Sequence, residues 1–295
     1  QDDRIFRIEQ HHVNHVLNVF QGFFAAPARG GLIITYRNDG TEALLNQGEY
    51  AQGVPVHSPG LTLPRQMMTM ALFYEQTKER IMPNVLDRVA EIGVVPVIAI
   101  DSVSHALPLA DALLAGGLPV AEITFRTDAA AEVIRLLSRE RPDLIVGAGT
   151  VLSPETMKTA HAAGAKFAVA PGLNPRVAQA AQELGMPFVP GIANPSDIEA
   201  GLDLGCRLLK FFPAEALGGV KLLTALSAPY RHTGVRFMPT GGVTTANLAD
   251  YLGLPAVAAV GGTWIAKKEE MAAGAWEAVA QRCRDARAVV RQVRG

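Results

Sequence analysis

The chain has 295 residues, of which 49% are hydrophobic, and its 27 Lys and Arg residues nearly balance its 28 Asp and Glu residues, for a net charge of -1. This composition excludes a strongly basic nucleic-acid-binding protein and favours a globular protein that binds small molecules. The longest apolar runs, such as VVPVIAI, are far shorter than the roughly 20 residues of a membrane helix, so we expect no membrane partner. Cys206 and Cys283 lie far apart, and no signal-peptide pattern opens the chain, so a cytoplasmic location is expected.

Residues 1–66 lack the rhythm of the rest of the chain and are expected to form a separate N-terminal extension. Three methionines between residues 67 and 70 precede the first predicted helix, so the extension is an appended segment, a processed piece or an upstream translation product. His11 and His15 lie four residues apart and could share a helix face as metal ligands, but no Glu or third ligand accompanies them. We interpret the pair as part of a solvated face and predict no metal site.

Short β-branched apolar runs alternate with Ala/Leu/Glu-rich segments from about residue 80 onward, which is typical of βα units around a parallel sheet. Eight such units predict a (β/α)8 TIM barrel over residues 67–295. An open doubly wound sheet is the alternative, but Gly147 and Gly149 lack the third glycine of a dinucleotide-binding motif. The predicted strands are residues 95–100, 119–125, 144–148, 166–170, 187–191, 207–212, 235–239 and 256–262.

A lysine interrupts the apolar segment RLLKFF. Side chains alternate across a strand, so Lys210 shares an otherwise apolar face with Leu208 and Phe212. It either extends to the barrel mouth, pairs with Glu215, or stays inside for a chemical purpose. Its place near the carboxyl end of a barrel strand favours the last, because active sites lie at that end. Burial generally lowers the pKa of a lysine and frees its lone pair to attack a carbonyl, so a Schiff base at Lys210 is expected.

The segment AEITFRT supplies a second pair of charged candidates. Glu122 and Arg126 have the same parity on this strand, so both side chains are expected to point into the barrel. Their Cα atoms would be about 13 Å apart. Glu122 would lie at mid-barrel as a general acid and base, and Arg126 near the mouth as an anion clamp. The alternative is a purely structural ion pair of Glu122 with Lys210 or with Arg126.

Two glycine pairs stand at consecutive strand ends, Gly241 and Gly242 in MPTGGVT and Gly261 and Gly262 before Thr263 in VGGTW. Barrels often bind phosphate in the loops after strands seven and eight, where glycines let backbone N–H groups approach the anion. We therefore expect a phosphorylated ligand.

Three further residues are assigned to the substrate pocket. Thr150 follows GAG at a strand end, Pro171 in APGL would shape a pocket wall, and Phe212 lies two residues beyond the lysine. Taken singly, residues of these kinds are more often turn or core residues.

The motifs EITFRT, VGAGTV, APGL, KFFPAE, PTGG and GGTW occur in this order, and together they resemble the class I aldolases of 2-keto-3-deoxy-6-phosphogluconate (KDPG) and 2-keto-4-hydroxyglutarate (KHG). The resemblance runs from about residue 94 to 290. It implies a barrel that assembles as a homotrimer, needs no metal or organic cofactor, and cleaves KDPG reversibly to pyruvate and glyceraldehyde 3-phosphate in the Entner-Doudoroff pathway. Whether the chain also cleaves 4-hydroxy-2-oxoglutarate to pyruvate and glyoxylate is left open.

The resemblance also implies a role for individual residues. Lys210 is similar to the Schiff-base lysine, Glu122 to the general acid and base, and Arg126 and Thr150 to substrate-binding residues. Thr240 resembles a position linked to stereochemical preference, and threonine there fits the gluconate branch better than the galactonate one. Thr263 departs from the serine that is common in the phosphate loop, although both side chains offer a hydroxyl. Residues 1–66 match nothing in the family.

Two other function classes remain as alternatives. A metal-dependent lyase, decarboxylase or epimerase would need several His, Asp or Glu ligands at strand ends, and Glu122 alone is seen there. A non-catalytic sugar-phosphate sensor on the same scaffold would be expected to have lost Lys210 or Glu122, and both are present.

Overall fold

The computed structural model describes residues 84–295. The expected extension over residues 1–66, with His11 and His15, lies outside this range, as do the methionines before the first predicted helix. Within residues 84–295, none of the helices combines the length and the apolar character that crossing a membrane requires.

The strands of the described chain pair in parallel throughout and form two sheets. One sheet has the order β5-β4-β3-β2-β1-β9, and the other has the order β6-β7-β8. Seven of the eight predicted strands are confirmed as single strands, the last of them beginning four residues later than predicted, and the fifth is divided in two. The strands are β1 (Val94–Ile98), β2 (Val120–Thr124), β3 (Ile145–Gly149), β4 (Phe167–Val169), β5 (Phe188–Val189), β6 (Gly191–Ile192), β7 (Leu208–Phe211), β8 (Arg236–Phe237) and β9 (Val260–Gly262).

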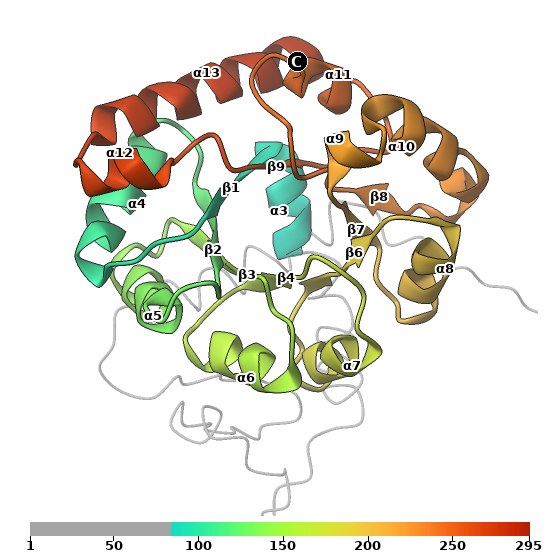
Figure 1. Ribbon diagram of the computed structural model, residues 1–295, viewed down its shortest axis with the longest axis horizontal. Helices are drawn as coiled ribbons and strands as arrows, with labels where there is room; N and C mark the ends of the chain where they lie inside the picture. Colours follow the sequence, from blue (N-terminus) through green and yellow to red (C-terminus); the bar gives the residue numbers. More distant parts are fainter. Residues whose placement is uncertain (1–83) are drawn as a thin grey trace, which may run out of the picture. The chain divides into compact units, whose positions relative to one another are not determined.

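The fifth predicted strand is divided into β5 and β6 at Pro190. Proline has no N–H to donate to a ladder, which explains an interruption at this residue. The carbonyl of Pro190 still accepts a hydrogen bond of 2.8 Å from the N–H of Lys210 on β7. Single parallel bridges, Phe237 to Val257 and Thr240 to Gly261, connect the chain around β8 with the chain around β9. The protein therefore has an α/β fold with a curled parallel sheet at its centre (Figure 1).

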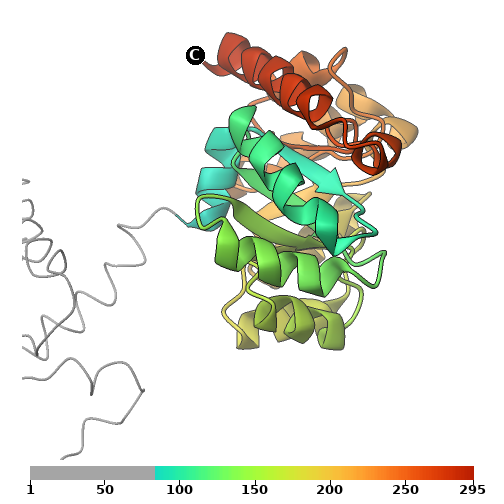
Figure 2. The same ribbon diagram turned by 90° about the vertical axis from the view of Figure 1, so that its left-hand side faces the viewer.

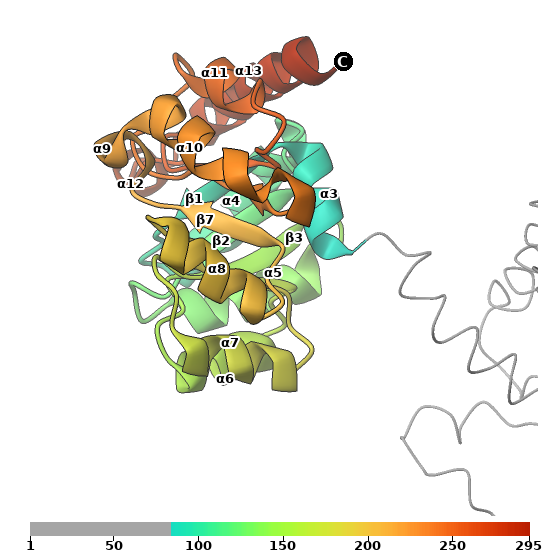
Figure 3. The same ribbon diagram turned by 90° about the vertical axis from the view of Figure 1, so that its right-hand side faces the viewer.

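Helices follow the strands in regular alternation and surround the sheet in all three views (Figure 1, Figure 2 and Figure 3). Several begin with a side-chain cap followed by proline, as at Ser153, Asn174 and Asn194, a combination that favours a helix start. The helices are α3 (Val85–Ile92), α4 (Ala106–Ala115), α5 (Ala130–Glu140), α6 (Pro154–Ala162), α7 (Pro175–Glu183), α8 (Pro195–Asp203), α9 (Ala214–Leu217), α10 (Gly219–Ser227), α11 (Leu248–Leu252), α12 (Lys268–Ala272) and α13 (Trp276–Arg294), with short 3-10 segments at Val103–His105 and Ala228–Thr233.

Every residue of β1, β2 and β3 is buried, as expected for parallel strands that are covered on both faces. The last helix, α13, is fastened to the segments that precede β1 and β9. Its Arg294 donates hydrogen bonds of 2.8 to 2.9 Å to the carbonyls of Ala90, Val257 and Ala258, and Arg287 donates one to Ile92. Helix α13 thus holds together the segments that lead into β1 and β9.

Candidate active site

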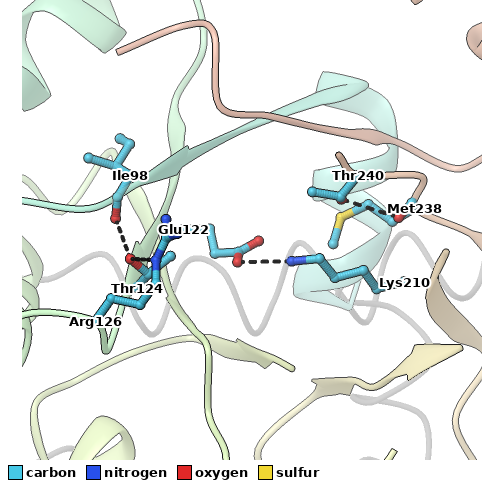
Figure 4. Close-up of polar contacts among 7 residues, drawn as sticks. All are labelled: Ile98, Glu122, Thr124, Arg126, Lys210, Met238 and Thr240. Atoms are coloured by element: carbon cyan, nitrogen blue, oxygen red, sulfur yellow. Dashed lines mark hydrogen bonds and ion pairs between the residues drawn. The ribbon is translucent and has the colours of Figure 1, made fainter. Parts of the chain in front are cut away.

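The Lys210 side chain lies inside the fold and points at Glu122 (Figure 4). Its Nζ is 3.3 Å from Glu122 Oε1, and the two residues are 5% and 0% exposed. Lys210 stands on β7 and Glu122 on β2, so the contact joins the two sheets. The predicted inward direction of both side chains is confirmed. The carboxylate that pairs with the lysine is Glu122, whereas Glu215 lies on α9 and accepts a hydrogen bond from Tyr251.

The Glu122 carboxylate has one oxygen engaged and one open. Oε1 accepts from Lys210, while Oε2 is buried without a hydrogen-bond partner among the described residues. An unpaired buried carboxylate oxygen is costly unless another group binds it, so its presence favours a binding or catalytic role. Gly149 on β3 leaves the space that this side chain needs, because a Cβ there would collide with Oε1 and lie 2.7 Å from Cγ.

Phe212 follows β7 on the same face as the lysine. Its ring centroid lies 5.5 Å from Lys210 Nζ, within the range of a cation–π contact. The alternation predicted for this strand therefore continues past its end and places an aromatic ring beside the amine. Phe212 is half-buried.

Arg126 stands on the turn after β2, because the strand ends at Thr124. Its side chain is exposed, and its Nε donates to Thr124 Oγ1 at 3.2 Å, which in turn donates to the carbonyl of Ile98 at 3.0 Å (Figure 4). The expected position at the carboxyl end of the strand is correct. Thr124 has the same strand parity as Arg126, so the hydrogen bond links two side chains that alternation assigns to one face.

Thr150 is half-buried directly after β3 and is the one residue other than glycine with a positive φ in the described chain, at 56°. A β-branched side chain in this region is strained, and such strain is typical of functional sites. Pro171 is half-buried after β4, where Gly191 on β6 lets the backbone of Pro171 approach closely. Gly191 is the register partner of Lys210, so the segment that contains Pro171 lies next to the lysine strand.

The two predicted glycine pairs lie on neighbouring segments, one in the turn after β8 and the other within β9. Thr240 is 2% exposed and pairs with Gly261, whose missing side chain makes room for the Thr240 hydroxyl. Gly241 and Gly242 form a turn with φ values of 97° and 79°, which glycine adopts without strain. The other pair is buried within β9, and the Gly261 N–H donates to the Pro239 carbonyl at 2.9 Å. Thr263, exposed at the end of β9, completes this cluster.

Several residues that shape the site were not assigned from the sequence. Gly149 and Gly191 act by leaving space, Thr124 orients Arg126, and Tyr251 binds Glu215. The two glycines follow or belong to strand segments, and a glycine within a strand is a signal of close approach by another group. Nothing in the local sequence indicates which group approaches.

Comparison with known proteins identifies the family. The family model for KDPG and KHG aldolase matches residues 85–282. The 2-dehydro-3-deoxy-phosphogluconate aldolase of Haemophilus influenzae is 45% identical over 202 residues, which cover 68% of this chain and 94% of that protein.

Two solved structures extend the similarity to the fold. The KDPG aldolase of Legionella pneumophila, captured with pyruvate as a covalent carbinolamine intermediate, is 41% identical with a TM-score of 0.65, covering 68% of this chain and 96% of that one. The aldolase of Zymomonas mobilis with 3-phosphoglycerate is 39% identical with a TM-score of 0.63, covering 69% and 95%. The chain described here belongs to the KDPG and KHG aldolase family.

Proposed function

We propose that the protein is a class I aldolase that cleaves 2-keto-3-deoxy-6-phosphogluconate to pyruvate and glyceraldehyde 3-phosphate. The observation that carries the proposal is the buried contact between Lys210 Nζ and Glu122 Oε1 at 3.3 Å. It supplies an amine nucleophile and a proton carrier at one point inside the fold. Family membership and the covalent pyruvate adduct of the Legionella pneumophila relative support the same chemistry.

The first half of the reaction forms the imine. A proton moves from Lys210 Nζ to Glu122, which leaves a neutral amine whose lone pair attacks the keto carbon of the substrate. The protonated Glu122 then gives its proton to the hydroxyl of the carbinolamine, which departs as water. The product is a protonated imine that draws electrons from the neighbouring carbon, and Glu122 is again a carboxylate.

The second half breaks the carbon–carbon bond. The Glu122 carboxylate removes the proton from the hydroxyl beyond the scissile bond, the aldehyde departs, and the bonding electrons pass into the imine to give an enamine. Glu122 returns its proton to the enamine carbon, and hydrolysis releases pyruvate and restores the lysine. The unpaired Oε2 of Glu122 is the oxygen available for these transfers, because Oε1 already contacts Lys210.

The surrounding residues are proposed to hold the two ends of the substrate. Arg126 and Thr150 would bind the carboxylate end, and Pro171 and Phe212 would form walls around the reacting carbons. Thr240, beside the lysine strand, would contact the hydroxyls that distinguish epimeric substrates. Fixing both ends aligns the scissile bond with the amine.

The phosphate is proposed to bind where the two glycine pairs meet. The N–H of Gly242 has no acceptor within the described residues, and the exposed Thr263 offers a hydroxyl. Gly241, Gly261 and Gly262 would keep this region free of side chains so that the anion can approach the backbone.

We also propose the finer organisation of the molecule. Counting β5 and β6 as one strand interrupted at Pro190, eight strands follow one another, and the bridge from Thr240 to Gly261 supports closure into a complete (β/α)8 barrel. Residues 67–295 would form this catalytic domain, with residues 1–66 as a separate extension. The family resemblance suggests a homotrimer, and the cysteine pattern of the sequence suggests a cytoplasmic location. The family also includes KHG aldolases, which supports 4-hydroxy-2-oxoglutarate as a second substrate.

Pyruvate release from each phosphorylated epimer tests the proposal. The unaltered protein should cleave the gluconate form faster than the galactonate form. The Lys210→Arg variant should lose at least about 1,000-fold in kcat, because a guanidinium cannot form the imine. The exposed Lys221 is a matched control, and Lys221→Arg should leave kcat unchanged. Full activity in Lys210→Arg, or no cleavage of either epimer by the unaltered protein, would refute the proposal.

A further inference from the structure

A buried tyrosine and a glutamate form a contact that the proposed reaction does not use. Tyr251 on α11 is 0% exposed, and its hydroxyl donates a hydrogen bond to Glu215 Oε1 on α9. Burial, and then the contact with Glu215, raise the pKa of Tyr251, so the hydroxyl remains a donor in neutral solution. The hydrogen bond joins α9, which follows β7, to α11, which follows β8.

Glu215 lies directly against the Gly241–Gly242 turn. Its N–H donates to the Gly241 carbonyl at 3.0 Å, and a Cβ at Gly242 would lie 2.6 Å from both Cβ and Cγ of Glu215. The preceding residue, Ala214, donates to the Thr240 carbonyl at 2.8 Å. On the other side of the turn, Asn247 Nδ2 donates to the Gly242 carbonyl at 3.4 Å. The turn is therefore held at both of its carbonyls.

The same segment is tied to the reactive lysine. Glu215 follows Lys210 by five residues, across the end of β7 and the first residues of α9. The Phe212 ring contacts Lys210, and a Cβ at Gly241 would lie 3.3 Å from that ring. Tyr251 secures the Glu215 side chain from the helix that follows the glycine turn. One short path of contacts thus connects the amine to the turn.

We propose that Tyr251 and Glu215 are positioning residues that hold the Gly241–Gly242 turn at a fixed place relative to the Lys210 amine, and thereby favour substrates with a terminal phosphate. This inference rests on the proposed phosphate site. Without the tyrosine hydroxyl, the Glu215 side chain would rotate freely beside the turn. The Glu215 carboxylate would then repel a bound phosphate, because the Tyr251 hydroxyl would no longer fix its position by a hydrogen bond.

Steady-state kinetics on two substrates test the inference. KDPG carries a phosphate, and 4-hydroxy-2-oxoglutarate carries none. In Tyr251→Phe, kcat/KM for KDPG should fall about tenfold, mainly through KM, since one positioning hydrogen bond to a charged group is lost. For the unphosphorylated substrate, kcat/KM should stay within about twofold of the unaltered value.

Two further variants separate positioning from folding. Glu215→Gln keeps a carbonyl that accepts from Tyr251 and should retain most of the preference for the phosphorylated substrate, whereas Glu215→Ala should lose it as Tyr251→Phe does. Tyr230→Phe is the matched control, because Tyr230 donates a comparable hydrogen bond to Glu199 at 2.9 Å on α8. Tyr230→Phe should leave kcat/KM unchanged for both substrates.

The outcomes are distinguishable. If the unaltered protein shows no preference for the phosphorylated substrate, the proposed phosphate site is wrong, and the inference is overturned with it. If that preference exists and survives intact in both Tyr251→Phe and Glu215→Ala, only the inference is overturned. An equal loss on both substrates would also overturn it, because a general disturbance of the active site would explain that result.

Discussion

The two ends of the parallel strands are built in different ways. At the carboxyl end, charged and polar groups such as Lys210, Glu122 and Thr240 are buried, and glycines leave the space around them. At the amino end, α13 covers the entry to β1 and β9 with Val290 packed against Gly93, and Arg294 binds three backbone carbonyls. No reactive pair comparable with Lys210 and Glu122 lies among the described residues of that end.

The carboxyl end of the strands therefore carries the reactive groups, and the amino end carries contacts that stabilise the fold. A buried ion pair contributes little to the free energy of folding, because desolvation of the two charges offsets their attraction. Hydrogen bonds to otherwise unpaired carbonyls and buried apolar contacts do stabilise the fold. Substitutions at the carboxyl end should therefore change activity more than stability, and those at the amino end should do the reverse.

Among the substitutions that test this comparison, the largest effect is expected from Gly149→Ala at the carboxyl end. The added methyl group would collide with Glu122, so the carboxylate must move away from Lys210. A displacement of about 1 Å in a catalytic group costs roughly 100-fold in rate, and we expect kcat to fall by about this factor. Steady-state kinetics measures the loss, and thermal melting checks that the fold survives. An unchanged kcat would show that the position of Glu122 is not critical.

At the amino end, Arg294→Ala should destabilise the protein by about 1–3 kcal/mol, because three carbonyls lose a charged donor. The melting temperature should fall while kcat/KM at a permissive temperature stays unchanged. Arg291 is exposed on the same helix and provides the control, because Arg291→Ala should keep the melting temperature of the unaltered protein. A loss of kcat/KM in folded Arg294→Ala would contradict the separation of the two ends.

A smaller and opposite effect is expected from Thr150→Gly. Relief of the positive φ of 56° contributes about 1–2 kcal/mol, and the greater freedom of glycine in the unfolded chain takes back about 0.5–1 kcal/mol. The free energy of unfolding should therefore stay unchanged or rise by up to about 1.5 kcal/mol, while loss of the hydroxyl lowers kcat/KM about tenfold. Denaturant unfolding measures the first quantity, and a clear loss of stability would contradict the strain argument.

Much of the architecture was predictable, because each strand is a compact run of apolar residues. Side chains alternate between the two faces of a strand, which places Lys210 and Phe212 on one face. The same alternation puts the apolar neighbours of Glu122 on the helix side and Glu122 itself inside the fold. The division of one strand at Pro190 was less apparent, because the apolar run continues through the proline.

The partner of Lys210 was not predictable from spacing. Glu122 and Glu215 were both candidates, and the choice is made by tertiary contacts: Gly149 admits Glu122 into the interior, and Tyr251 holds Glu215 against the glycine turn. Contacts between residues this far apart in sequence leave no local signal.

The central claim is that the amine buried opposite Glu122 bonds covalently to a keto acid. Incubation with pyruvate and borohydride, followed by peptide mass analysis, tests this directly. The account predicts one stable adduct, carried by Lys210, and none in Lys210→Arg. An unmodified protein, or an adduct on a lysine other than Lys210, would contradict it.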